Sequence, residues 1–322
     1  MKKIILFFAL ATVGCKLSHA VQDVPNIKVI DVASAPEIPD NGRLDFKNKK
    51  SFYAFFKKIE IDEGYAQKAA EKITHLDADN HSINNLPKEI GTLKNLVELD
   101  LFKNQLTSLP QEMENLTNLT KLNITDNKLT SFNIECKKLI NLQLSGNKFT
   151  SFPLQITKLV NLIFLDLSGN PIAPLPPQIG DLAKLETLLL GSTGLTLLPP
   201  EIEKLIGLDD LNLGNNKFET FPPQIMALTN LKWLNLDFND LTSLPQGIEK
   251  LINLRQLKLL SNKLTSLPQE IGKLKNLDCL DLRRNELAWL PREIMNLRRL
   301  KNLPLDDNPV HDDNKFWGNC VQ

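Results

Sequence analysis

Residues Leu254 to Leu274 read L-R-Q-L-K-L-L-S-N-K-L-T-S-L-P-Q-E-I-G-K-L, and this stretch decides the fold. Its frame, L-x-x-L-x-L-x-x-N-x-L-x-x-L-P-x-x-I-x-x-L, returns along most of the chain. The asparagine of the frame recurs every 23 residues, apart from one step of 20, and Thr193 replaces it once. These ladder asparagines are Asn104, Asn127, Asn147, Asn170, Asn216, Asn239, Asn262, Asn285 and Asn308. A constant period of this size indicates a solenoid, in which each repeat packs on its neighbours.

The first part of the frame predicts a short strand. In L-x-x-L-x-L the fourth and sixth positions are apolar and the fifth is polar, which is the alternation of a strand with one buried face. Copies of such a strand can stack into a parallel sheet that buries its leucines in one core. The asparagine follows the strand, where the chain turns. Because a carboxamide both donates and accepts, stacked copies can satisfy the backbone groups of successive turns. Thr193 offers only a hydroxyl group, so we expect a weaker repeat there.

The second part of the frame leaves room for a thin return path. In Leu109-Pro110-Gln111-Glu112-Met113 the proline restricts one backbone angle and removes a donor. The few residues before the next strand predict an extended segment or a short helical turn. The single 20-residue repeat, from Leu119 to Lys138, is expected to lose its three residues from this side.

The frame resembles the leucine-rich repeat. It begins at Ile73 and ends in a half-repeat from Leu300 to Val310, with ten full repeats before it. The resemblance implies an α/β repeat solenoid over residues 73–310. We therefore expect a horseshoe with a parallel concave β-sheet and an extended or short-helical convex side.

The first 20 residues have the pattern of a signal peptide. Lys2 and Lys3 precede an apolar run from Ile4 to Val13, which is too short to span a membrane. Two cleavage sites remain open. One follows Ala20 in Ser18-His19-Ala20, and the other resembles a lipobox at Thr12-Val13-Gly14-Cys15, in which Cys15 would be lipidated and would anchor the protein to a membrane.

The remaining segments outside the repeats are short. Residues 21–50 contain prolines and charged residues without a periodic apolar face, and they predict a flexible linker. In residues 51–72, Phe52, Phe55, Phe56 and Ile59 have helical spacing, which predicts a small helical cap on the first leucine layer. Residues 311–322 form a short C-terminal tail.

Composition excludes several classes of function. Lys plus Arg and Asp plus Glu are both 38, so no basic excess indicates a nucleic-acid partner. No apolar stretch after the leader has the length of a membrane span. The sparse cysteines show neither a disulfide framework nor zinc spacing. About 50 residues before the repeats and a dozen after them are too few for a catalytic domain. We expect no enzyme activity, no cofactor and no resident metal.

The candidate binding residues lie at the variable positions of the predicted concave face. A central patch combines apolar and charged side chains from successive repeats, and aromatic anchors often carry the energy of protein interfaces. Its members are Phe164, Leu189, Asp210, Trp233, Phe238, Lys258 and Leu260. The alternative is that these are scattered exposed apolar residues, which are common.

A second patch is predicted at the amino-terminal end of the same face. It consists of His75, Asp77, Asp79, Glu98 and Asp100. A histidine with several carboxylates can hold a divalent ion. A solvated acidic face that meets a basic partner is the interpretation we prefer.

The 23-residue L-P-x-x-I form resembles two groups of proteins: exported repeat proteins of spirochaetes and other bacteria, and intracellular signalling scaffolds of the Ras-associated kind. The leader favours the first group. The resemblance implies an exported module, secreted or at the cell surface or outer envelope, whose concave face binds an extracellular or host protein. The alternative is a structural envelope component that binds glycan or its own copies. Partner identity and oligomeric state are left open by these patterns.

Overall fold

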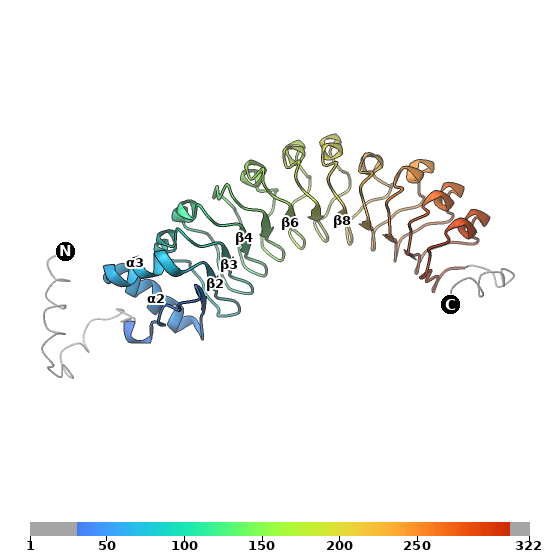
Figure 1. Ribbon diagram of the computed structural model, residues 1–322. Coiled ribbons are helices and arrows are strands. Elements are labelled where there is room, and N and C mark those ends of the chain that lie inside the picture. Colours follow the sequence, from blue (N-terminus) through green and yellow to red (C-terminus); the bar gives the residue numbers. More distant parts are fainter. Residues whose placement is uncertain (1–30, 310–322) are drawn as a thin grey trace, which may run out of the picture.

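The computed structural model describes residues 31–309, which form a curved solenoid (Figure 1). One parallel sheet of eleven strands, arranged in sequence order, lines the inner side of the arc. The strands are β1 (Arg43–Asp45), β2 (His75–Asp77), β3 (Glu98–Asp100), β4 (Lys121–Asn123), β5 (Asn141–Gln143), β6 (Phe164–Asp166), β7 (Thr187–Leu189), β8 (Asp210–Asn212), β9 (Trp233–Asn235), β10 (Gln256–Lys258) and β11 (Cys279–Asp281). This confirms the predicted concave parallel sheet.

The sheet keeps one register along its length. Leu257 of β10 is paired with Leu234 of β9 and Leu280 of β11. The central leucine of each strand is buried, and the residues on either side of it point to the concave surface. The alternation therefore places the third and fifth positions of the frame in two rows along the arc.

The ladder asparagines join each turn to the preceding repeat, as the sequence predicts. Nδ2 of Asn127 donates to the carbonyls of Leu101 at 2.8 Å, Ile124 at 3.2 Å and Thr125 at 3.2 Å, and its Oδ1 accepts from the Leu106 amide at 2.9 Å. Because Asn127 and Leu106 are both buried, Oδ1 of Asn127 supplies the acceptor that the Leu106 amide would otherwise lack.

The outer side of the arc carries short 3₁₀ turns (Figure 1). Each turn of the repeats begins directly after the proline of the frame, whose φ suits the start of a helix. The isoleucine of the frame lies inside the turn and is buried. The turns are η2 (Lys88–Thr92), η3 (Gln111–Asn115), η4 (Leu154–Lys158), η5 (Pro177–Asp181), η6 (Pro200–Lys204), η7 (Pro223–Ala227), η8 (Gln246–Lys250), η9 (Gln269–Lys273) and η10 (Arg292–Asn296).

The 20-residue repeat differs from the others on this outer side. No 3₁₀ turn forms between β4 and β5, whereas the register of the two strands is regular. Phe132, Ile134 and Cys136 fill the core in place of the leucine-proline arc. The three missing residues are therefore lost from the convex side, as predicted.

Two helices cap the first repeat. They are α2 (Lys49–Ile61) and α3 (Glu63–Lys72), preceded by the 3₁₀ turn η1 (Val32–Ser34). Asn48 caps α2 by accepting the Ser51 amide at 3.0 Å, and Asp62 caps α3 by accepting the Tyr65 amide at 3.0 Å. The predicted helical cap is confirmed.

The expectation of a flexible linker over residues 21–50 is wrong from residue 31 onward. β1 pairs with β2, so Arg43, Leu44 and Asp45 form the first strand of the sheet. Phe46 packs edge to face against Phe52 and Phe55, with centroids 5.1 and 5.5 Å apart. The sequence did not predict this strand, because prolines and charged residues surround it and its single buried leucine gives only a short alternation. Residues 21–30 lie outside the described residues.

One continuous apolar core runs from Ile38 to Leu297. Full burial of one leucine contributes about 1.5–3 kcal/mol, so the stacked leucines supply the main favourable term. The predicted signal peptide (1–20), the candidate lipidation site Cys15 and the C-terminal tail (311–322) lie outside the described residues.

Candidate functional site

Two hollows lie on the concave sheet. The central hollow, of about 230 Å³, is lined by residues of β7 to β10. The amino-terminal hollow, of about 300 Å³, is lined by residues of β1 to β5. Each overlaps in part with one of the patches predicted from the sequence.

The central hollow joins an indole ring to two charged groups. Leu189, Asp210, Trp233 and Lys258 line it together, each from a different strand. Trp233 is 37% exposed, and Lys232 Nζ lies 5.6 Å from the centre of its ring. A large ring held on a rigid strand provides apolar contact area at low conformational cost.

The charges of the central hollow can orient a ligand. Burial raises the pKa of Asp210, and the neighbouring Asp209 raises it further, whereas Lys258 opposes the shift. Asp209 itself forms an ion pair with Lys232 at 2.8 Å. Asp210 and Lys258 form no ion pair with each other among the contacts of residues 31–309. An acceptor and a donor are thus available beside the apolar surface.

The other three predicted members of the central patch lie outside the hollow. Phe164 is on β6, where it pairs in register with Thr187 of β7, next to the hollow. Phe238 and Leu260 follow β9 and β10 at the loop edge, and the Phe238 amide donates to the Leu260 carbonyl at 2.7 Å. Phe238 is 48% exposed and has φ of 53°, a conformation uncommon for a bulky side chain. The structure therefore brings together four of the seven residues and places three at the margin.

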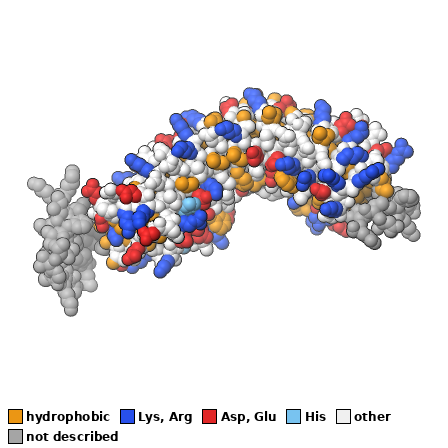
Figure 2. Space-filling model, in the orientation of Figure 1, with side chains coloured by type: hydrophobic (Ala, Val, Ile, Leu, Met, Phe, Trp, Pro, Cys, Tyr) orange, Lys and Arg blue, Asp and Glu red, His pale blue; other side chains and the backbone are white. Residues whose placement is uncertain are grey.

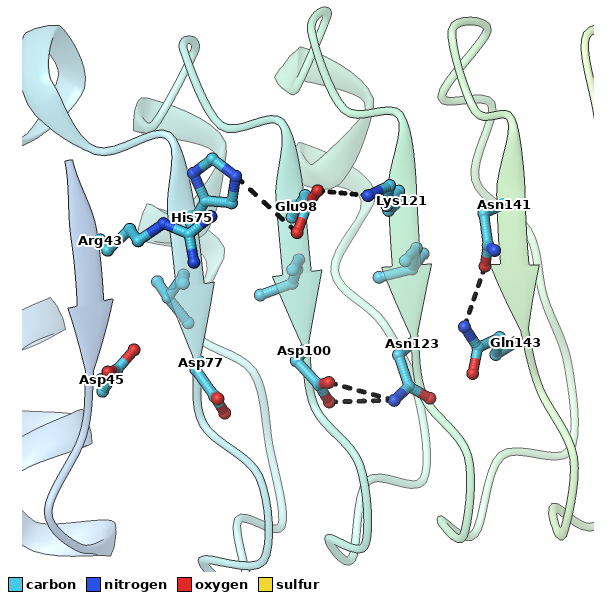
Figure 3. Close-up of a pocket in the computed structure, with 13 residues that line it drawn as sticks. Arg43, Asp45, His75, Asp77, Glu98, Asp100, Lys121, Asn123, Asn141 and Gln143 are labelled. Carbon is cyan, nitrogen blue, oxygen red and sulfur yellow. Dashed lines mark hydrogen bonds and ion pairs between the residues drawn. The ribbon is translucent and has the colours of Figure 1, made fainter. Parts of the chain in front are cut away.

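The amino-terminal hollow is polar and has two rows (Figure 3). One row, which consists of Arg43, His75, Glu98, Lys121 and Asn141, has mixed charge. The second row, which consists of Asp45, Asp77, Asp100, Asn123 and Gln143, begins with three carboxylates. Acidic and basic groups therefore face the same hollow from neighbouring strands.

Most groups in the mixed row already have partners. Glu98 accepts from Lys121 Nζ at 2.6 Å and lies 3.7 Å from His75 Nε2. The hydrogen bond from Lys121 holds the pKa of Glu98 below its ordinary value. Asn141 Oδ1 accepts from Gln143 Nε2 of the acidic row at 3.0 Å.

The acidic row has hydrogen bonds, such as those from the Phe102 amide and Asn123 Nδ2 to Asp100, but within residues 31–309 its three carboxylates form no ion pair. Burial raises the pKa of Asp100, and the nearby Asp77 and Asp79 add to the shift. Asp77 Oδ1 accepts the Asp79 amide at 3.0 Å, which places Asp79 at the loop edge and away from the hollow. The carboxylates lie side by side on successive strands and do not converge on one point. In residues 31–309 no group of three or more His, Cys, Asp or Glu is arranged to hold a metal ion.

Sequence reasoning missed part of each hollow. Arg43 and Asp45 were assigned to the expected linker, although Arg43-Leu44-Asp45 has the same alternation as His75-Leu76-Asp77. Comparing these two triplets would have found the extra strand. In the central hollow, Asn212, Asn235 and Gln256 complete the lining, and their polarity gave no signal in the sequence.

A second asparagine ladder was also missed. Asn253 Nδ2 donates to the Thr229 carbonyl at 2.9 Å, and Asn276 Nδ2 donates to the Ile252 carbonyl at 2.9 Å. These asparagines precede the first leucine of a repeat and bind the backbone of the repeat before it.

None of the helices within residues 31–309 has both the length and the apolar character that a membrane span requires.

Comparisons with known proteins identify the repeats. Leucine-rich repeat family profiles match residues 245–313 (a leucine-rich repeat region), 183–241 and 161–182 (leucine-rich repeats) and 94–135 (two copies of the repeat). A leucine-rich repeat protein of Leptospira interrogans is 31% identical, with 87% of this chain and 91% of that chain covered and a TM-score of 0.50. None of the curated proteins matches the sequence.

Other solved structures share the fold. An internalin from Listeria monocytogenes has a TM-score of 0.62 at 19% identity, with 80% of this chain and 81% of that chain covered. The ectodomain of a plant membrane receptor kinase from Arabidopsis thaliana, in complex with Casparian strip integrity factor 2, is 29% identical with a TM-score of 0.51. That match covers 73% of this chain but only 35% of the ectodomain.

Proposed function

Because the chain belongs to the leucine-rich repeat family, we propose that it is an exported protein-binding module whose concave face holds an extracellular or host protein. Leucine-rich repeat modules typically bind proteins, and the arc offers one continuous inner surface for a partner. The apolar leader of residues 4–13 supports export. The plant ectodomain, solved in complex with Casparian strip integrity factor 2, supports a binding role for a solenoid of this kind.

The observation that carries the proposal is the composition of the central hollow. Trp233 and Leu189 are apolar groups on the solvent side of a sheet whose other face holds the leucine core. Asp210 and Lys258 flank them without a mutual ion pair. An aromatic anchor surrounded by polar groups is the usual energetic centre of a protein interface.

The amino-terminal hollow is assigned a secondary role. Asp45, Asp77 and Asp100 present a row of carboxylates that suits a basic segment of the same partner. Its other charges are largely neutralised by pairs such as Glu98 with Lys121. We therefore assign the anchor of the partner to the central hollow and orientation to the amino-terminal hollow.

The test is partner capture with paired variants. The chain and a Leu189→Ser, Trp233→Ala variant are immobilised and exposed to extracellular and host-surface proteins, and bound proteins are quantified by mass spectrometry. A Leu197→Ser, Trp289→Ala variant is the matched control, because both residues are exposed, at 59% and 52%, and neither lines the hollow.

A partner retained by the control and lost by the hollow variant supports the proposal. Equal capture by both variants contradicts it. Loss of self-association alone, measured by sedimentation velocity, would favour the structural envelope component that binds its own copies.

A further inference from the structure

One flank of the solenoid has a charge pattern unlike the rest of the chain. On this side the chain passes from each outer 3₁₀ turn back to the next strand. We call it the return flank, defined by the two residues before the first leucine of each repeat, such as Ile252 and Asn253 before Leu254. The repeats that begin with a leucine, from Leu96 to Leu300, give two columns along the arc that contain no aspartate or glutamate, whereas the first repeat has Glu71 and Lys72 before Ile73.

Cations and aliphatic side chains occupy these columns. Lys94, Lys137, Lys275 and Arg298 are exposed in the first column. The same column contains Val160, Ile206 and Ile252, which are 50%, 65% and 57% exposed, one in every second repeat. A surface that covers these aliphatic groups gains free energy from their burial.

The cations are densest at the C-terminal end of this flank. Every arginine of the chain except Arg43 lies at or after Arg255. Arg298 and Arg299 are exposed and adjacent, and Arg299 Nη1 donates only to Asn276 Oδ1, at 3.1 Å. Figure 2 shows Lys and Arg side chains gathered over the repeats at the C-terminal end of the arc. Among residues 31–309, no carboxylate forms an ion pair with Arg255, Arg298, Arg299 or Lys301.

Carboxylates do occur beside the return flank. Glu186, Asp209 and Asp278 are at the next position of their repeats, one residue after the first leucine. Asp209 is neutralised by Lys232 at 2.8 Å. The remaining two leave the flank strongly cationic.

The opposite flank, formed by the turns after the strands, is balanced. There Lys263 pairs with Asp240 at 2.7 Å, and Arg284 pairs with Asp307 at 3.4 Å. The excess of cations is therefore a property of one side of the molecule, although the whole chain has no net charge.

We propose that the return flank docks on an anionic lipid surface. Anionic headgroups attract the exposed Lys and Arg side chains, and Ile206 and Ile252 enter the boundary between headgroups and acyl chains. A sulfated polysaccharide would be held by the cations alone and would leave these isoleucines in water. Docking on the flank leaves the concave face free, so a docked molecule can still bind a protein partner.

The experiment measures binding to vesicles by flotation. It uses the chain from Val21, the form left by cleavage after Ala20, because the apolar leader would itself bind lipid. Vesicles of phosphatidylcholine alone are compared with vesicles that contain about 30% phosphatidylglycerol. Circular dichroism verifies that each variant is folded.

Three variants separate the contributions. Lys275→Gln, Arg298→Gln, Arg299→Gln should weaken binding to the anionic vesicles roughly tenfold or more. Ile206→Ser, Ile252→Ser should weaken it roughly threefold to tenfold. Lys128→Gln, Lys148→Gln, Lys217→Gln removes three exposed lysines from the opposite flank and should leave binding nearly unchanged.

The proposal requires binding that depends on phosphatidylglycerol and is weakened by salt. It is overturned by a chain that ignores anionic vesicles, by equal losses in both charge variants, or by an isoleucine variant that binds like the original chain. Retention on immobilised heparin without vesicle binding would also overturn it and would indicate a sulfated polysaccharide.

Discussion

The repeat around Asn239 and the repeat around Thr193 occupy equivalent places in the solenoid, but they are joined to their neighbours differently. Nδ2 of Asn239 donates to the carbonyls of Leu213 at 3.0 Å and Leu236 at 3.1 Å, and its Oδ1 accepts from the Phe218 amide at 3.1 Å. Leu213 and Phe218 belong to the preceding repeat, so Asn239 fastens two repeats together.

Thr193 closes its own turn but does not reach the repeat before it. Its Oγ1 lies 2.7 Å from the Leu190 carbonyl and 3.0 Å from Asn216 Oδ1, and a single hydroxyl proton serves one of them at a time. The Ile172 amide, the counterpart of Phe218, donates instead to the nearby Asn170 carbonyl at 2.8 Å.

The comparison shows that two kinds of contact join neighbouring repeats, the hydrogen bonds of the sheet and those of the ladder asparagines, and that one can be lost while the other is kept. β6 and β7 keep their register, and the Leu167 amide still donates to the Leu189 carbonyl at 2.9 Å. Only the side-chain link is lost. The junction between β6 and β7 lies between Phe164 and Leu189, so a junction without an asparagine link to the preceding repeat is next to the proposed binding surface.

The largest expected effect comes from Asn239→Ala. The variant leaves the buried Phe218 amide without an acceptor and removes one of the two side-chain bonds to each of the Leu213 and Leu236 carbonyls, which keep Asn216 and Asn262. We expect the free energy of unfolding to fall by about 3 kcal/mol. Urea denaturation measures it. Asn253→Ala is the control, because that exposed carboxamide makes only the bond to Thr229, and its cost should be below about 1 kcal/mol. An equal fall in the free energy of unfolding in both variants would show that the buried ladder asparagines contribute no more to stability than an exposed asparagine.

A smaller loss is expected for Thr193→Ala. The variant removes one hydroxyl donor, shared between the Leu190 carbonyl and Asn216 of the following repeat, and no link to the preceding repeat, so the free energy of unfolding should fall by about 1 kcal/mol. The same urea experiment gives the value. A cost equal to that of Asn239→Ala would contradict the difference between the two repeats.

Thr193→Asn should strengthen the weaker junction. A carboxamide at this position can reach the Leu167 carbonyl and the Ile172 amide, as its counterparts do in other repeats. We expect a gain of about 1 kcal/mol in the free energy of unfolding, since the Ile172 amide already has a local acceptor. Destabilisation would show that the turn from residue 170 to 174 has no room for the longer side chain.

The smallest effect concerns local opening. The Ile172 amide should exchange with deuterium faster than the Leu241 amide, which donates to Asn262 Oδ1 at 3.0 Å. In Thr193→Asn the two rates should approach each other, whereas the Leu241 rate stays unchanged. Exchange followed by mass spectrometry on peptides that contain each residue measures both.

Much of the fold was predictable because the same sequence frame recurs in every repeat. The frame around Leu257 and Asn262 gives the strand, the turn and the buried column, and ten copies leave little ambiguity. β1 was missed because it occurs once and lacks the frame after it. The pattern of Leu44 between Arg43 and Asp45 does not by itself distinguish a strand from a loop. Its pairing with β2 identifies it as a strand.

The candidate site was predictable only in part. Column positions placed Leu189 and Trp233 on the concave face, because strand alternation decides which side chains point outward. They did not show that Phe164 stays outside the hollow, which begins one strand later, at β7. The charged return flank was overlooked because its members are spread over the chain at intervals of one repeat.

The sequence by itself determined the solenoid, its repeat number and the inward leucines, because a periodic frame constrains every copy in the same way. Tertiary structure alone decided which variable residues meet. Arg43 joins Glu98 and Asp100 around one hollow only after three strands pair, and Ile206, Ile252 and Arg298 form one flank only after their repeats stack. The physical reason is that stacking makes residues one repeat apart in the sequence into neighbours in space. The sequence shows these neighbours only when its repeats are aligned with one another.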